Sequence, residues 1–196
     1  LLNRGVTEVI EKDHLKAQLL SGKQLRVKLG FDPTGPNLHI GRAIILRKLR
    51  EFQNLGHKVV FIVGDFTAKI GDPSDKLEKR PTLTDAQIKA NLKNYKAQVG
   101  KIIDLRKAEF VFNSKWLKKL TVTDFLSIQR AFTTNQMMTR RNFSERVEKG
   151  GDVGLEETSY PLMQGYDSVM VKADVELSGF DQLFNLKAGR VIQGHF

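Results

Sequence analysis

Residues 59–63 read VVFIV, an unbroken run of β-branched and aromatic side chains. A strand that is apolar on both faces has to be covered on both faces, which is typical of a parallel sheet in an α/β protein. An earlier segment, LRVKLG at residues 25–30, alternates and ends in glycine, which indicates a second, short strand. The first constraint on the fold is therefore a sheet with a strand buried on both sides.

A helix is expected between these two strands. The apolar residues Ile45, Leu49 and Phe52 recur at helical spacing in a helix that begins near Ile40, and Gly56 follows where a C-cap belongs. Strand, helix and strand in succession make a βαβ unit. Such a unit implies parallel strands joined by a right-handed crossover.

Further expected elements alternate along the rest of the chain. Thr84 and Gln87 stand at the spacing of a capping box, and Thr123 is a candidate N-cap. Residues 133–158 are polar and show no clear pattern. The expected elements are a helix over 84–99, strands at 109–112 and 172–177, and helices at 123–132 and 181–193. This alternation predicts an α/β fold, a doubly wound, Rossmann-like parallel sheet with helices on both faces.

The composition limits what such a fold can be. The 196 residues allow one substantial core, and the absence of cysteine excludes disulfides and thiolate metal sites and favours a reducing, cytoplasmic compartment. The longest apolar runs, at 59–63 and 43–46, are far too short to span a bilayer. The net charge of +10 suits a polyanionic partner such as RNA, but it also suits a surface that only keeps the chain soluble.

The most turn-prone segment lies between the first strand and the helix that follows it. Residues 30–43 read GFDPTGPNLHIGRA. In an open parallel sheet, ligands bind at the carboxyl ends of the strands, beside helix N-termini whose N–H groups are unpaired. An anion such as phosphate is therefore expected here, with His39 at the mouth of the helix as a candidate hydrogen-bond donor. A lone histidine in a loop is more often simply solvated, so the residues around His39 have to indicate whether it binds a ligand.

Four segments, in order, resemble one known family. KLGFDPTGPNLHIGR at 28–42 resembles the HIGH signature of the class I aminoacyl-tRNA synthetases, in its tyrosyl-tRNA synthetase form. Residues 64–76 resemble the GDPSG loop of that family, 159–168 its tyrosine-binding helix, and 175–185 its GG(S/T)DQ motif. The chain thus resembles the catalytic domain of bacterial-type tyrosyl-tRNA synthetases over nearly its whole length.

The resemblance implies ATP-dependent activation of tyrosine to tyrosyl-adenylate and transfer of the tyrosyl group to its tRNA. By resemblance, Asp167 accepts a hydrogen bond from the substrate phenol. Tyr160, Gln164 and Asp72 surround the α-ammonium group. Tyr160, Gln164 and Asp167 lie at i, i+4 and i+7, so a helix places them on one face, although an ordinary amphipathic helix has the same spacing.

The resemblance also implies an ATP side of the site. Thr34 and His39 correspond to residues that stabilise the γ- and β-phosphates, and Arg42 occupies the last position of the signature. Lys76 and Arg80 match cations of a mobile loop that meet the departing pyrophosphate. The other implied residues are Gly30, Asp32, Gly41, Gly179 and Asp181 along the ATP cleft, and Gln182 near the ribose and the tyrosyl carboxylate.

Partners follow from the same resemblance. Tyrosine, ATP with Mg²⁺ and the tyrosine tRNA are implied as substrates, with no resident metal and no membrane. A homodimer is also implied, with an interface near residues 131–143, where Phe132, Met137 and Met138 are the apolar candidates.

The sequence departs from the family pattern in several places. Arg42 replaces the second histidine of the signature, and Ser178 and Phe180 replace smaller residues beside the expected adenosine. The second signature, KMSKS, and an anticodon-binding domain are not found, so a truncated catalytic domain that binds tyrosine but forms adenylate poorly is expected. Two alternatives remain at this point, a non-catalytic RNA-binding remnant of a synthetase and another nucleotidyl transferase with an HxGH-type signature.

Overall fold

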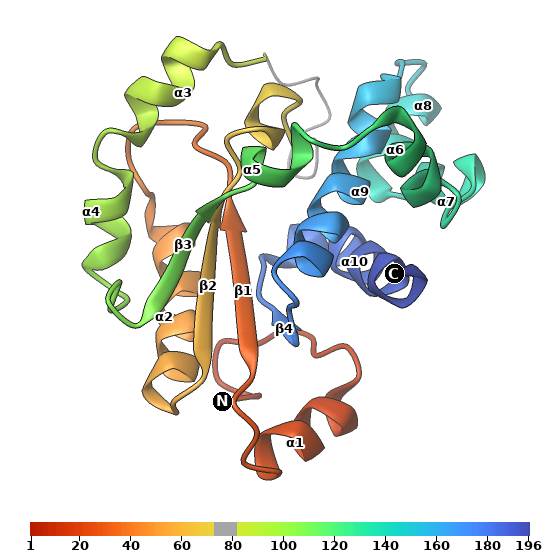
Figure 1. Cartoon of the computed structure of the whole chain (residues 1–196). Helices are drawn as coiled ribbons and strands as arrows, with labels where there is room; N and C mark the ends of the chain where they lie inside the picture. The colour runs from red at the N-terminus through yellow and green to blue at the C-terminus, as the bar shows by residue number, and fades with distance from the viewer. Residues whose placement is uncertain (73–81) are drawn as a thin grey trace.

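The computed structural model describes residues 1–72 and 82–196 (Figure 1). Its strands form one sheet in the order β3-β2-β1-β4, and every pairing is parallel. The strands are β1 (Arg26–Phe31), β2 (Lys58–Val63), β3 (Ala108–Phe112) and β4 (Val175–Glu176). The predicted parallel sheet is confirmed.

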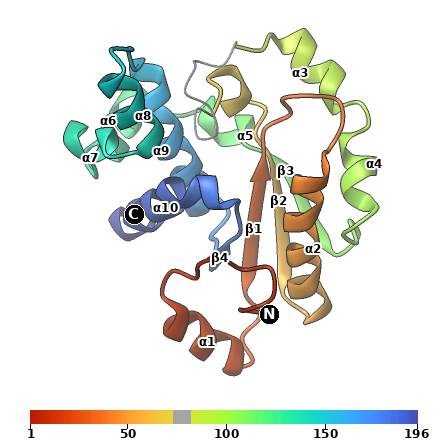
Figure 2. The ribbon, with the colours of Figure 1, turned by 180° about the vertical axis from the view of Figure 1, so that it is seen from behind.

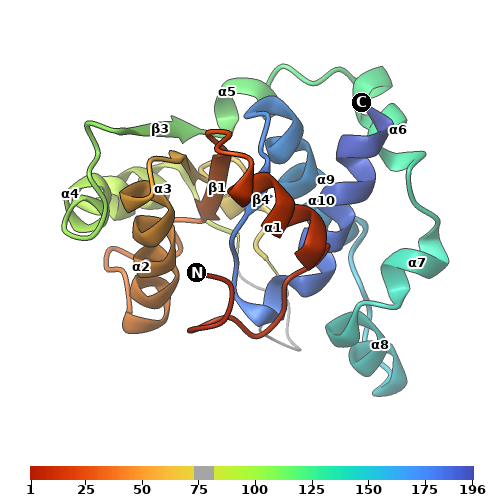
Figure 3. The same cartoon turned by 90° about the horizontal axis from the view of Figure 1, so that it is seen from below.

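Helices cover both faces of this sheet, as predicted (Figures 1 and 2). Viewed from below, α2 lies on one side of the strands, and α9 and α10 lie on the other (Figure 3). The helices are α1 (Lys12–Leu20), α2 (Ile40–Asn54), α3 (Asp85–Leu92), α4 (Tyr95–Gly100), α5 (Ser114–Leu117), α6 (Val122–Gln129), α7 (Thr134–Met138), α8 (Arg141–Glu148), α9 (Leu155–Met170) and α10 (Leu183–His195), with 3₁₀ turns η1 (Thr67–Lys69) and η2 (Phe180–Gln182). None of the helices in these described ranges is long and apolar enough to cross a membrane.

The predicted βαβ unit is β1–α2–β2. Gly56 ends α2 by taking a positive φ of 88°, a conformation that costs glycine little because it has no Cβ. The N–H of His57 then bonds to the carbonyl of Phe52 at 3.1 Å, and that of Gly56 bonds to the carbonyl of Gln53 at 3.1 Å. This pair of bonds is the Schellman motif, which satisfies the last carbonyls of the helix and turns the chain into β2.

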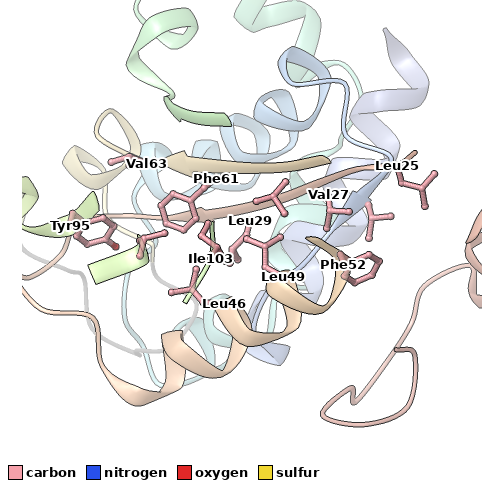
Figure 4. Close-up of a cluster of buried hydrophobic side chains, with 13 residues drawn as sticks. Leu25, Val27, Leu29, Leu46, Leu49, Phe52, Phe61, Val63, Tyr95 and Ile103 are labelled. Carbon is pink, nitrogen blue, oxygen red and sulfur yellow. The ribbon is translucent and has the colours of Figure 1, made fainter. Parts of the chain in front are cut away.

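The main core fills the space between the sheet and α2 (Figure 4). Alternate residues of β1 and β2, such as Leu29 and Phe61, point to this face and meet Leu46 and Leu49 of α2. Tyr95 of α4 closes the cluster and is fully buried. Burial of this kind stabilises a fold by roughly 25 cal/mol per Å² of apolar surface, which makes this cluster the main anchor of α2.

The opposite face of the sheet is also buried. Val60 and Ile62 of β2 pack against Trp116 and Leu117 of α5, which explains why residues 59–63 are apolar without interruption. A further cluster joins the helices beyond the sheet and contains Ile128, Met137, Leu162 and Ile192. Met137 is only 5% exposed, so the expectation that it offers an apolar surface to a second subunit is wrong.

The single helix expected over residues 84–99 is two helices. The Thr84–Gln87 capping box is confirmed and starts α3. The chain then breaks at Asn94, whose φ of −113° and ψ of 7° are not helical, and α4 begins at Tyr95. Asparagine is a weak helix former, and the break allows Tyr95 to enter the main core.

The N-cap of α6 is Thr121, not Thr123. The Thr121 hydroxyl accepts a hydrogen bond from the N–H of Asp124 at 3.1 Å, and the Asp124 carboxylate accepts one from the N–H of Thr121 at 3.0 Å. Thr123 has no acidic or amide side chain three residues later to complete such a box. The helix also ends earlier than expected, at Gln129.

Three other expectations change in extent. Residues 133–158 contain α7, α8 and the start of α9; Thr133 caps α7 through a capping box with Gln136. The strand expected at 172–177 is only Val175–Glu176, because Lys172 takes a left-handed φ of 51° and bends the chain before the strand. The helix expected at 181–193 is α10 preceded by the turn η2, so regular α-helix begins only at Leu183.

Candidate active site

A cavity of about 500 Å³ opens at the carboxyl edge of the sheet. It lies between β1 and β4, where the connections to the neighbouring strands pass over opposite faces, the usual ligand site of such sheets. Lys76 and Arg80 lie outside the described residues. All other candidate residues line this one cavity: Gly30, Asp32, Thr34, His39, Gly41, Arg42, Asp72, Tyr160, Gln164, Asp167, Gly179, Asp181 and Gln182.

Asp167 lies buried on α9 and points its carboxylate at two donors. Trp116 donates its indole N–H to Oδ1 at 2.7 Å, and the Asn113 amide donates to Oδ2 at 3.2 Å. Burial raises the pKa of Asp167 from 3.8 to about 6, while the positive charge of Lys28 and these two hydrogen bonds oppose the rise. At neutral pH the carboxylate is therefore ionised and can accept a further hydrogen bond from a ligand.

Asn113 cannot rotate its amide to suit another partner. Its Oδ1 accepts a hydrogen bond from the N–H of Phe66 at 3.0 Å, and its Nδ2 also donates to the hydroxyl of Thr67 at 3.1 Å. These contacts fix which end of the amide faces Asp167. The cavity therefore presents an acceptor, and not a donor, at the position of Asp167.

Asp32 is the second buried carboxyl group in the cavity. Its Oδ1 accepts the hydroxyl proton of Thr67 at 2.7 Å, and its Oδ2 accepts the phenol proton of Tyr160 at 2.9 Å. Burial raises its pKa to about 7, against the effect of these two hydrogen bonds. The close approach requires glycine at position 64, because a Cβ there would lie 1.9 Å from Asp32 Oδ1.

Asp72 joins two parts of the molecule that are far apart in sequence. Arg140, which is 3% exposed, donates to its Oδ1 at 3.0 Å, and the Gln182 amide donates to its Oδ2. Asp72 is thereby held next to the end of η2 and the start of α10. Together with Tyr160 and Gln164 it surrounds one end of the cavity with oxygen atoms.

The start of α2 forms the other end of the cavity. His39 is the N-cap residue, and its exposed side chain makes no capping hydrogen bond. Arg42, in the first turn, donates to the Tyr95 hydroxyl at 2.8 Å and to Thr34 Oγ1 at 3.1 Å, and its guanidinium lies 5.1 Å from the centre of the Phe31 ring. A cation held in this way beside a helix N-terminus suits a ligand with phosphate groups.

The two altered residues beside the expected adenosine have different positions. Ser178 lines the cavity, whereas Phe180 does not belong to the described lining and is 60% exposed. Phe180 therefore does not obstruct the cavity. A Cβ at Gly179, between them, would lie 2.3 Å from Asp181 Oδ1, so a larger residue there would displace the Asp181 carboxylate.

Sequence analysis missed several residues of the site, among them Thr67 and Glu176 of the cavity lining and the four residues considered next. Asn113 follows β3 directly, so its position after a strand could have indicated it. Trp116 lies one turn later, but nothing in the sequence couples it to Asp167. Lys28 and Asn185 gave no signal, because a lysine in an alternating strand is expected in solvent and an asparagine in a helix has no preferred partner.

The fold and the site together define a class of protein. The chain belongs to the class I tRNA synthetases for tryptophan and tyrosine, whose family model matches residues 20–196. Curated relatives named tyrosine–tRNA ligase include those of Carboxydothermus hydrogenoformans, 46% identical over 100% of this chain and 49% of the relative, and Oleidesulfovibrio alaskensis, 48% identical over 97% of this chain and 48% of the relative. The chain spans about half the length of these relatives.

Solved structures agree on the fold. A C-terminally truncated mitochondrial tyrosyl-tRNA synthetase from Coccidioides posadasii superposes with a TM-score of 0.79 at 26% identity, covering 98% of this chain and 58% of the other. The tyrosyl-tRNA synthetase of Archaeoglobus fulgidus has a TM-score of 0.75 at 23% identity, over 96% of this chain and 56% of the other. The predicted Rossmann-like architecture is that of these enzymes.

Proposed function

We propose that this chain is part of the catalytic domain of a tyrosine–tRNA ligase, which activates tyrosine with ATP and transfers the tyrosyl group to its tRNA. The observation that carries the proposal is the face of α9, where Asp167 and the pair Tyr160 and Gln164 line one cavity. A carboxylate suits a phenol proton, and several oxygen acceptors suit an ammonium group. Relatives at 46–48% identity carry the name of this activity.

Tyrosine is expected to bind with its phenol at Asp167 and its α-ammonium group near Tyr160, Gln164 and Asp72. The Tyr160 hydroxyl donates its hydrogen bond to Asp32, so the Tyr160 oxygen can only accept a hydrogen bond from a ligand. The phenol of a bound tyrosine would meet an ionised Asp167, which favours tyrosine over phenylalanine because phenylalanine would leave that buried carboxylate without the bond.

ATP, with its Mg²⁺, is the second substrate in this proposal. A carboxylate oxygen of tyrosine forms a bond to the α-phosphorus, the bond from that phosphorus to the α,β-bridging oxygen breaks, and pyrophosphate leaves with the bonding electrons. His39, Thr34 and Arg42 line the cavity beside the N-terminus of α2, and in this proposal they donate hydrogen bonds to the phosphates. Stabilising charge that develops on a leaving group is a large part of catalysis in such reactions.

The experiment is binding of tyrosine and phenylalanine by calorimetry, followed by tyrosine-dependent exchange of pyrophosphate into ATP. The wild-type chain should bind tyrosine in preference to phenylalanine, and Asp167→Ala should abolish the preference. Equal binding of the two amino acids by the wild-type chain would contradict the proposal. Exchange by this chain should be weak but measurable and dependent on tyrosine, whereas an RNA-binding remnant would give none.

The homodimer, the participation of Mg²⁺ and the cytoplasmic location stay predictions. With Met137 in the core, the half-buried Phe132 and Met138 stay candidates for a subunit contact. Val122 and Leu126 on α6 are further candidates, since they are 77% and 50% exposed. Sedimentation at micromolar concentration tests this, since a species of 22.2 kDa alone would contradict dimerisation of this chain.

A further inference from the structure

Asn185 of α10 is fully buried behind the cavity and joins two glutamines that line it. Its amide nitrogen donates to Gln164 Oε1 at 2.8 Å and to Gln182 Oε1 at 2.6 Å. Both protons of the Asn185 amide are therefore used. Asn185 itself is not part of the described cavity lining, so it can act on a ligand only through these two side chains.

The far side of each glutamine is held by a carboxylate. The Gln164 amide nitrogen donates to Glu176 Oε1 at 3.0 Å, and Glu176 is in turn ion-paired with the buried Lys28 at 3.0 Å. The Lys28 ammonium also donates to the Ser168 hydroxyl at 2.7 Å and to the Gln164 carbonyl at 2.8 Å. All three of its protons are used, so Lys28 holds Glu176 and has none left for a ligand.

Gln182 is held in the same manner. Its amide nitrogen donates to Asp72 and, at 2.9 Å, to Asp181. Arg140 supplies the cation that pairs with Asp72, at 3.0 Å. An ionised carboxylate accepts hydrogen bonds and cannot donate them, so the nitrogen of each glutamine has to face its carboxylate and the oxygen has to face Asn185.

We propose that Asn185 is a positioning residue that fixes the side-chain oxygens of Gln164 and Gln182 as acceptors and thereby makes this end of the cavity selective for an ammonium group. Each of these oxygens keeps a second lone pair, and both amide protons of Gln182 are already committed to carboxylates. With Tyr160 giving its proton to Asp32, the groups around this end offer acceptors. A cation is bound there in preference to a neutral or anionic group.

One further feature is consistent with this role. Asn185 Oδ1 is buried and has no hydrogen-bond partner among the residues that the structure describes. An unpaired buried oxygen destabilises a fold, so an apolar residue of similar shape would suit the packing of α10 better. What asparagine adds at this position is its pair of amide protons.

The inference rests on the proposed function, and its test compares two ligands that differ in the ammonium group alone. Calorimetry measures the dissociation constants of L-tyrosine and of 3-(4-hydroxyphenyl)propanoate for the wild type and for Asn185→Leu, which is similar in size but has no donor. The preference of the wild type for tyrosine should fall by roughly tenfold to a hundredfold in Asn185→Leu, the size expected for one hydrogen bond to a charged group. Binding of the propanoate should change little.

Ile192→Val is the matched control, because Ile192 lies on the same helix, is as fully buried, and packs in the cluster of apolar residues beyond the sheet. It should leave the preference unchanged. An unchanged preference in Asn185→Leu, or an equal fall in Ile192→Val, would overturn the inference. A wild type that binds neither ligand would contradict the proposed function itself.

A second measurement needs neither ligand nor variant. In ¹⁵N-labelled wild-type chain, the side-chain amide protons of Asn185 and Gln182 should exchange slowly with solvent, because all of them are held in hydrogen bonds. Fast exchange of the Asn185 amide protons would show that it does not hold the glutamines, and would overturn the inference even if Asn185→Leu failed to fold.

Discussion

Asp167→Asn should change how the stability of the chain depends on pH. Asp167 has a folded-state pKa raised to about 6, above the ordinary 3.8, because burial disfavours its charged form. Between these two values the folded state therefore holds more protons than the unfolded state. The contribution of Asp167 to stability is complete below about pH 4 and is lost as the pH rises through about 6.

The magnitude follows from the same two values. A difference of about two pKa units corresponds to ~3 kcal/mol, which is the stability that wild type should lose relative to Asp167→Asn between pH 4 and pH 7. For a chain of this size that is a relative change of ~6–12 °C in melting temperature. In the variant, the amide protons of the new asparagine face the fixed amide protons of Asn113, so the hydrogen bond between these two side chains is lost. This loss costs ~1–3 kcal/mol at every pH and does not change how stability depends on pH.

The assay is urea unfolding of both proteins at several pH values from 4 to 8, without ligand. Asp104→Asn is the control, because hydrogen bonds from Arg106 lower the pKa of Asp104 below its ordinary 3.8, so its contribution to stability is lost only in more acidic solution and should stay nearly constant from pH 4 to 8. A constant difference between wild type and Asp167→Asn over this range would refute the argument. So would a wild type that gains stability relative to the variant as the pH rises.

Two further predictions concern the residues around this site. Trp116→Phe removes the indole N–H that opposes the raised pKa of Asp167, so the pH midpoint of tyrosine binding, measured by calorimetry, should rise by about one unit, and an unmoved midpoint would contradict this. Gly165→Ala would place a Cβ 2.5 Å from Ile192 where α9 meets α10, so the free energy of unfolding measured in urea should fall by ~1–3 kcal/mol. The control is Gly194→Ala, whose Cβ meets no described atom within 4 Å and which should be neutral or slightly stabilising.

The sequence was sufficient to predict those parts of the site that lie within one segment of the chain. Tyr160, Gln164 and Asp167 share a face of one helix, and the helix after β1 begins at the predicted position. The prediction from periodicity was wrong where a tertiary contact overrides the local pattern. The expected single helix breaks before Tyr95, and this break lets Tyr95 pack in the core. The prediction was also wrong at Thr123, because the spacing to Asp124 selects Thr121 as the cap.

Periodicity, capping spacings and the turn-rich residues 30–43 were sufficient to determine the parallel sheet, its first crossover and the helix N-terminus at the cavity, because these depend on neighbours along the chain. Only the tertiary structure decided which polar groups are buried together. Lys28 reads as a surface residue of an alternating strand, yet it is 1% exposed because helices cover both faces of the sheet. Asn185 lies between Gln164 and Gln182 because α9 and α10 pack side by side, and no local pattern encodes that contact.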